Sequence, residues 1–220
     1  MQETKSTFNL GFVFVDLGDP FYRAATHEMV KSAKRAMPGV KITQISDKKT
    51  PAHPMVDDVL SVDTEVTKDN ISTFKGHFMA ELAMKIDGPL ILCDVDLVWN
   101  RPITEATFHR PVSLLYREHF PSMPFNTGLM FSSGTEVAKG WWKHYQNVID
   151  DLHRYGVGWY SDQIAAAIAG LRDERVDALP MALYADAPVD MPEVKSTAYT
   201  THCKGERKSW MMDYARKVAA

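Results

Sequence analysis

The strongest structural signal in the chain is the stretch Gly88-Pro89-Leu90-Ile91-Leu92-Cys93-Asp94-Val95-Asp96-Leu97-Val98-Trp99. An apolar run that follows a Gly-Pro break predicts a strand buried on both faces of a sheet. Carboxylates are costly to bury unless they are paired or bind a cation. Side chains at positions i and i+2 of a strand point the same way, so Asp94 and Asp96 are expected to converge on one divalent ion. The alternative is a strand end with two solvated carboxylates.

Length and composition indicate a globular protein. The chain has 220 residues, 45% hydrophobic and 24% charged, with no linker, repeat or low-complexity tract. These features predict one domain over residues 1–220. A net charge of -3 gives no general attraction to nucleic acid or anionic membrane. The charge is uneven, because Lys195 to Ala220 carries six basic and two acidic residues, or +4, which leaves -7 for the rest. Such a tail could be solvated or could dock a diphosphate.

The cysteines and apolar runs predict where the protein resides. Cys93 and Cys203 form neither a C-x-x-C motif nor a disulfide framework. The N-terminus lacks a signal peptide pattern, and the longest apolar runs are too short to span a membrane. We therefore expect a reduced, soluble, cytoplasmic protein.

The start of the chain predicts a strand–helix–strand unit. A strand is expected over residues 8–15, and a second over 40–45. Between them, Asp19 is expected to cap a helix that begins at Pro20. This order is typical of a mostly parallel sheet, in which ligands bind beyond the carboxyl ends of the strands. Asp16 and Asp47 fall there, so either could hold a nucleoside base or ribose, or could simply stabilise a turn.

Three further helices are predicted from serine caps. Ser72 is expected to cap a helix that ends near Gly88, and Ser161 a short alanine-rich helix. Ser133 and Glu136 match a capping box. Additional strands are expected at residues 59–62, 112–116, 125–131 and 176–179, and a short helix near the C-terminus.

Four motifs, in order, resemble the GT-A glycosyltransferases, above all the retaining, glycogenin-like enzymes of glycosyltransferase family 8. The apolar strand ending in Asp94-Val95-Asp96 resembles the D-x-D metal motif. The other three are Phe125-Asn126-Thr127-Gly128-Leu129-Met130, Ser161-Asp162-Gln163, and His202 to Trp210, which resembles H-x-x-G-x-x-K-x-W. Ser209 stands where the family usually has proline. The resemblance implies an α/β GT-A fold: a mostly parallel central sheet flanked by helices.

The resemblance also implies a set of site residues. Asp94, Asp96 and His202 would ligate Mn²⁺ (or Mg²⁺) bridging the diphosphate of a nucleotide-sugar, with UDP-sugar as the expected donor. Asp162 would lie under the anomeric carbon with Gln163 beside it, and these two would be the catalytic residues. The donor-binding residues implied are Lys75, Asn126, Gly205 and Lys208, with Asp16 as a further candidate. The acceptor stays open among a saccharide, a lipid, a protein and a modified nucleic acid.

Other function classes remain possible from the sequence. Sugar-nucleotide pyrophosphorylases share a similar sheet, but they begin with a glycine-rich basic loop that residues 16–20 lack. Phosphatases that use D-x-D carry it near the N-terminus and follow it with Gly-Thr, unlike Leu97-Val98. A sugar-nucleotide-binding protein without activity is the non-enzymatic alternative.

Overall fold

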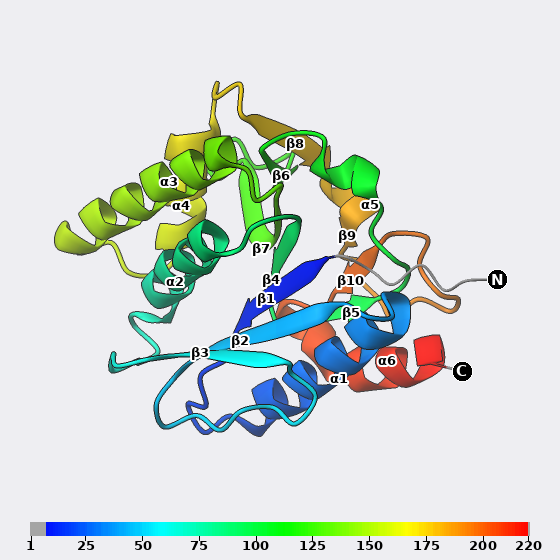
Figure 1. Cartoon of the computed structure of the whole chain (residues 1–220). Coiled ribbons are helices and arrows are strands. Elements are labelled where there is room, and N and C mark those ends of the chain that lie inside the picture. The colour runs from blue at the N-terminus through cyan, green and yellow to red at the C-terminus, as the bar shows by residue number, and fades with distance from the viewer. Residues whose placement is uncertain (1–7, 220) are drawn as a thin grey trace.

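A seven-stranded sheet forms the centre of the computed structural model, which describes residues 8–219 (Figure 1). Its strand order is β3-β2-β1-β4-β7-β6-β8, and β7 is the one strand of the seven that runs opposite to the others. The seven strands are β1 (Asn9–Val13), β2 (Lys41–Asp47), β3 (Asp58–Val62), β4 (Leu90–Cys93), β6 (Val112–Tyr116), β7 (Phe125–Ser132) and β8 (Val176–Pro180). The mostly parallel sheet predicted from the sequence is confirmed.

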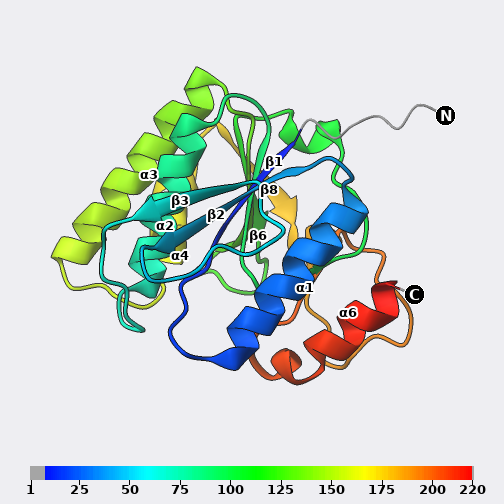
Figure 2. The same cartoon turned by 60° about the horizontal axis from the view of Figure 1, so that its bottom comes forward.

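Helices cover both faces of this sheet (Figures 1 and 2). One face carries α2 (Ile71–Lys85), α3 (Glu136–Arg154) and α4 (Ser161–Gly170), and the other carries α1 (Pro20–Ala36) and α6 (Met211–Ala219). The shorter helical segments are η1 (Glu105–Phe108), α5 (Met181–Tyr184) and η2 (Gly205–Trp210). Within residues 8–219, no helix combines the length and hydrophobicity needed to cross a membrane.

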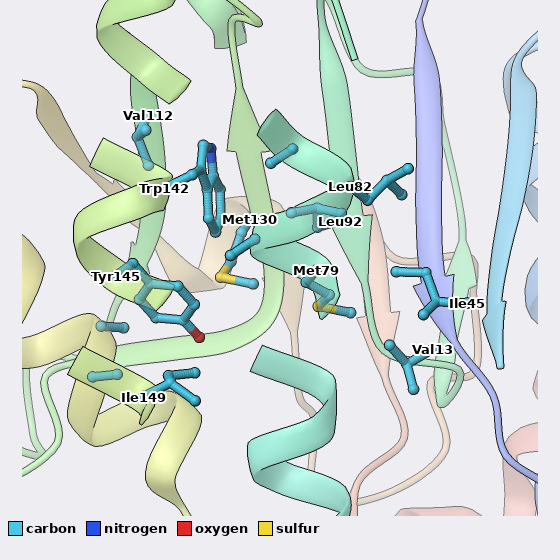
Figure 3. Packing of buried hydrophobic residues seen from close by; sticks show 14 of the residues in the cluster. Val13, Ile45, Met79, Leu82, Leu92, Val112, Met130, Trp142, Tyr145 and Ile149 are labelled. Carbon is cyan, nitrogen blue, oxygen red and sulfur yellow. The ribbon is translucent and has the colours of Figure 1, made fainter. Parts of the chain in front are cut away.

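A large apolar cluster packs α2 and α3 against the sheet. Trp142 and Tyr145 of α3 lie over Met130 and Leu92 of the central strands (Figure 3). Burying such aromatic side chains stabilises the fold by roughly 2–3 kcal/mol each. Gly76 lets α2 approach α3 closely, because a Cβ there would lie 2.0 Å from Ile149 Cδ1. This contact fixes the N-terminal half of α2, where several cleft residues are found.

The predicted run from Leu90 to Trp99 is two strands in two different sheets. β4 ends at Cys93, and the chain turns through Asp94 to Asp96 before β5 (Leu97–Trp99). β5 belongs to a three-stranded sheet with β10 (Thr200–His202) and β9 (Ala185–Asp186). His202 pairs with Leu97 in this small sheet, so the tail is brought beside the aspartates.

The helix caps were predicted correctly at one of four sites. Asp19 Oδ1 accepts a hydrogen bond from Phe21 N at 2.9 Å, and Pro20 begins α1. The other three predicted caps, all serines, are not N-caps: Ser72 and Ser161 lie within α2 and α4, and Ser133 lies two residues before the N-cap of α3. Their hydroxyls have other partners, Asp162 for Ser72, Thr73 for Ser161 and Thr135 for Ser133. The N-caps are instead Asn70, Thr135 and Tyr160.

Candidate active site

A cleft of about 590 Å³ opens at the carboxyl edge of the parallel strands. It is lined by the end of β1, the turn after β4, the first turns of α2 and α4, and the start of η2. In open α/β sheets this edge is where ligands bind. The position predicted from the strand–helix–strand opening is therefore the position of this cleft.

Three potential metal ligands meet at the wall of this cleft, which Asp94 and Asp96 line and which His202 approaches from the buried side. One ligand atom from each of Asp94, Asp96 and His202 lies within 4.8 Å of the others. Asp96 and His202 are buried, whereas Asp94 is partly exposed. The aspartates converge, but through the turn after β4 and not through the pleat of one continuous strand as expected. The turn is held by two backbone hydrogen bonds, from Asp94 N to Gly128 O and from Cys203 N to Asp96 O, each 2.8 Å long.

The donor set suits a divalent cation. Carboxylates and a neutral imidazole are ligands that Mn²⁺ accepts, while Mg²⁺ prefers oxygen alone. Gly128 supports this arrangement, because a Cβ there would lie 2.8 Å from His202 Cε1 and 3.1 Å from Asp94 Oδ2. A side chain at position 128 would therefore push two of the three ligands apart.

Asp96 and His202 already interact. His202 Nε2 lies 3.2 Å from Asp96 Oδ1. Burial raises the pKa of Asp96, but His202, Lys208 and Lys75 together outweigh burial and keep that pKa below its ordinary value. Asp96 is therefore an ionised ligand at neutral pH.

Lys75 joins the metal-ligand cluster to Asp162. Its Nζ lies 2.9 Å from Asp94 Oδ1 and 2.7 Å from Asp162 Oδ2. Burial lowers the pKa of Lys75, but the two carboxylates together raise it above the ordinary value. Lys75, which the resemblance implies as a donor-binding residue, therefore already has two carboxylates as partners.

Asp162 is 2% exposed, and its oxygens are engaged by donors on two other elements. Ser72 Oγ donates to Oδ1 over 2.7 Å, and Thr127 Oγ1 donates to Oδ2 over 2.5 Å. Burial raises the pKa of Asp162, but Lys75 and the two hydroxyls lower it below the ordinary value overall. Asp162 is consequently a fixed, ionised carboxylate on the cleft wall.

Two lysines and a glycine of the tail reach the same cleft. Lys204, Gly205 and Lys208 all line it. Lys208 Nζ contacts the hydroxyl of Tyr22 at 2.5 Å and lies 4.4 Å from the centre of its ring. Gly205 has φ of 68°, and a Cβ there would meet no atom within 4 Å. The backbone is therefore open to a ligand at Gly205, and the tail expected at the site is present there.

Two predicted donor-binding residues have other immediate partners. Asn126 Oδ1 accepts a hydrogen bond from Gly128 N at 2.7 Å, so this side chain stabilises the turn beside the metal ligands. Asp16 forms a 2.7 Å ion pair with Arg23 and lines a neighbouring cavity of about 440 Å³. The hydrogen bond from Arg23 is the main reason that the pKa of Asp16 is lowered. Asp47 accepts from Thr50 N at 2.8 Å, as expected of a turn aspartate.

Sequence reasoning missed several cleft residues. Trp159 and Tyr160 line the cleft and are 61% and 39% exposed. Tyr160 has φ of 67°, an uncommon conformation for a residue with a bulky side chain. Arg117, at the end of β6, contacts Gln163 from behind the cleft wall. The glycines that precede Trp159 and Tyr160 are a sequence signal that could have indicated this aromatic pair. No neighbouring residue indicates the contact that Arg117 makes.

Comparisons with known proteins give structural matches only. The sequence matches no protein-family model and no curated protein. A glycosyltransferase involved in the glycosylation of the major capsid of PBCV-1 superposes with a TM-score of 0.64 at 12% identity, covering 95% of this chain and 98% of that chain. Galactosyltransferase LgtC, in complex with donor and acceptor sugar analogs, superposes with a TM-score of 0.63 at 12% identity, covering 96% and 95%. The chain thus has the GT-A fold that these glycosyltransferases share.

Proposed function

We propose that this protein is a metal-dependent, retaining glycosyltransferase that moves a sugar from a nucleotide-sugar, with UDP as the favoured nucleotide, to an acceptor. One observation carries the proposal: Asp94 and Asp96, with the buried His202 within 4.8 Å of both, share a cleft with the tail lysines and with Asp162. The superposition on two glycosyltransferases over almost the whole chain supports it, and so does the resemblance of the four motifs.

The diphosphate would be recognised at the metal end of the cleft. Asp94, Asp96 and His202 would hold a divalent cation, Mn²⁺ on the basis of the imidazole, which would offset the charge of the diphosphate leaving group. Lys208 and Lys204 would add positive charge from the tail, and Gly205 would allow close approach of the backbone to a phosphate.

Asp162 would act at the sugar. Because it is ionised and lines the cleft, it can stabilise the positive charge that develops on the anomeric carbon. Its oxygens already interact with Ser72, Thr127 and Lys75, which reduces their availability for covalent attack. We therefore assign Asp162 an electrostatic role.

The acceptor would enter beside the exposed aromatic pair. Trp159 and Tyr160 lie at the same cleft as Asp162 and present apolar ring surface to solvent. An aromatic face at a binding cleft suits the apolar side of a sugar ring, so a saccharide is the first acceptor class to test.

The test is a panel of nucleotide-sugars scored for Mn²⁺-dependent hydrolysis and transfer, together with calorimetry of UDP with and without Mn²⁺. We expect UDP binding that requires the cation and is reduced about tenfold or more in Asp94→Asn and Asp96→Asn. Asp63→Asn is the matched control, because its side chain is 84% exposed and paired with Lys48. Unchanged binding in both cleft variants would refute the metal site.

The same panel separates the alternatives. Binding without turnover of any donor would indicate a sugar-nucleotide-binding protein. Release of phosphate from simple phosphate esters would indicate a phosphatase, and pyrophosphate-dependent turnover a nucleotidyltransferase.

A further inference from the structure

Arg117 makes a contact behind the cleft that the proposed chemistry does not use. Its Nη2 donates to Gln163 Oε1 over 2.7 Å and to Phe125 O over 2.9 Å, and it also donates to Met123 O. The backbone N of Arg117 donates to Pro124 O at 2.7 Å. Arg117 therefore ties the loop between β6 and β7 to the first turn of α4.

This contact determines which way the Gln163 amide points. The two ends of a glutamine amide are difficult to tell apart by shape, and only the hydrogen-bond partners distinguish them. A guanidinium can only donate, so the amide atom that faces Arg117 must be the oxygen. Burial lowers the pKa of Arg117, with Asp162 and Tyr160 opposing the shift, yet a guanidinium stays protonated in proteins.

With its oxygen bound to Arg117, the Gln163 amide has its nitrogen free to donate a hydrogen bond into the cleft. Gln163 is 5% exposed and lines the cleft beside Asp162. Within residues 8–219, Gln163 Nε2 donates no hydrogen bond, and this nitrogen is not fully buried. It is a donor with access to the space where a ligand would lie.

We infer that Arg117 is a positioning residue that holds Gln163 with its amide nitrogen toward the cleft, so that Gln163 donates a hydrogen bond to an oxygen of the bound sugar. The inference rests on the proposed function for the identity of the ligand. It assigns Gln163 the role of a donor, and it excludes Gln163 Oε1 as the group that faces the reacting carbon, because that oxygen is already bound to Arg117.

Substitutions of Gln163 distinguish a donor from an acceptor. Gln163→Glu keeps the shape and the pairing with Arg117 but replaces the donor by an acceptor, and Gln163→Met removes the donor without adding charge. With Mn²⁺ and whichever of UDP-glucose, UDP-galactose and UDP-N-acetylglucosamine the parent turns over, we expect kcat about tenfold or more lower in both variants, with the Kd for UDP within about twofold. Parent-like turnover in either variant would overturn the donor role.

A double-mutant cycle tests whether Arg117 acts through Gln163. Arg117→Met should lower kcat, and Arg117→Met combined with Gln163→Met should lose no more than Gln163→Met alone. Additive losses would mean that Arg117 only stabilises its loop. Arg154→Met is the control, because Arg154 is an exposed residue of α3 that pairs with Asp151.

A measurement on the ligand-free protein keeps the inference testable if no donor is turned over. The NMR signals of the Gln163 carboxamide are identified by their absence in Gln163→Met. Arg117→Met should shift these signals and Arg154→Met should not. Signals that do not move in Arg117→Met would refute the contact, whereas failure of every nucleotide-sugar to bind would refute the proposed function alone.

Discussion

The ammonium of Lys75 and the carboxylate of Asp162 form an ion pair 2.7 Å long, with side chains only 17% and 3% exposed. The pair joins the N-terminal half of α2 to the first turn of α4, and its two residues are 87 positions apart in the sequence. Because Asp94 contacts the same ammonium, three charges share one partly dehydrated space. Removing the ammonium leaves both carboxylates without compensation, and the cost is expected to be large.

Lys75→Met should therefore destabilise the protein strongly. We expect a loss of about 3 kcal/mol in the free energy of unfolding, since two carboxylates would lose their shared cation. Urea denaturation monitored by circular dichroism measures this change. Lys139→Met is the control, because the partners of Lys139, Asp87 and Glu136, are almost fully exposed, and its effect should be far smaller. Equal losses in the two variants would contradict the buried-pair argument.

Asp162→Asn should lower turnover far more than donor binding. The substitution would remove the negative charge that we propose to lie beside the anomeric carbon, and we expect kcat to fall about 100-fold while the Kd for UDP with Mn²⁺ changes little. Steady-state kinetics and calorimetry measure the two effects. Asp173→Asn is the control, because Asp173 pairs with Arg175 outside the cleft. An Asp162→Asn variant with parent turnover would leave Asp162 as a structural partner of Lys75.

Gly128→Ala should weaken the metal site. The new methyl group would lie 2.8 Å from both His202 Cε1 and Asn126 Oδ1, so one of them must move. We expect Mn²⁺-dependent UDP binding to fall about tenfold or more. Gly140→Ala is the matched control on α3, where the nearest atom lies 3.9 Å away and alanine should stabilise the helix by about 0.5–1 kcal/mol. Normal binding by Gly128→Ala would show that the ligands do not need this space.

The stability of the protein should fall in acid partly because of Asp162. Its pKa is lower in the folded protein than in the unfolded chain, where it is near 3.8, so the unfolded chain takes up the proton first. The contribution of Asp162 is complete above pH 4 to 5 and is lost as the pH falls through the folded-state pKa, by up to about 1.4 kcal/mol per pH unit. Urea titrations between pH 7 and pH 3 should give a steeper decline for the parent than for Asp162→Asn. Identical slopes would mean that folding does not lower the pKa of Asp162.

The tail segment from Lys204 to Trp210 should become ordered over a bound donor. Its residues Lys204, Gly205 and Lys208 line the cleft, so a diphosphate there would contact them. We expect slower hydrogen exchange across this segment when UDP and Mn²⁺ are added together, with no change in α3 as the internal reference. Exchange that is insensitive to UDP and Mn²⁺ would remove the tail from the donor site.

The sequence predicts those parts of the molecule that depend on local chemistry. The Asp19-Pro20 start of α1 and the buried β4 are encoded by neighbouring residues, and both are confirmed. The caps predicted at Ser72 and Ser161 fail where both hydroxyls have partners far along the chain, Asp162 for Ser72 and Thr73 for Ser161. Arg117 was missed for a related reason, since its contact with Gln163 spans 46 positions and no local pattern records it.

The three-residue pairing of β10 with β5 couples the end of the chain to the divalent ion that we propose. His202 pairs with Leu97, so sliding β10 by one residue would turn its imidazole to the opposite side of the ribbon. The register in turn depends on the cation. A cation that binds only the correct register of β10 stabilises that register by RT ln(1 + [M]/Kd), where [M] is the free metal concentration. A higher metal concentration would thereby favour the correct pairing of β10 with β5, and chelation would loosen the tail before the central sheet.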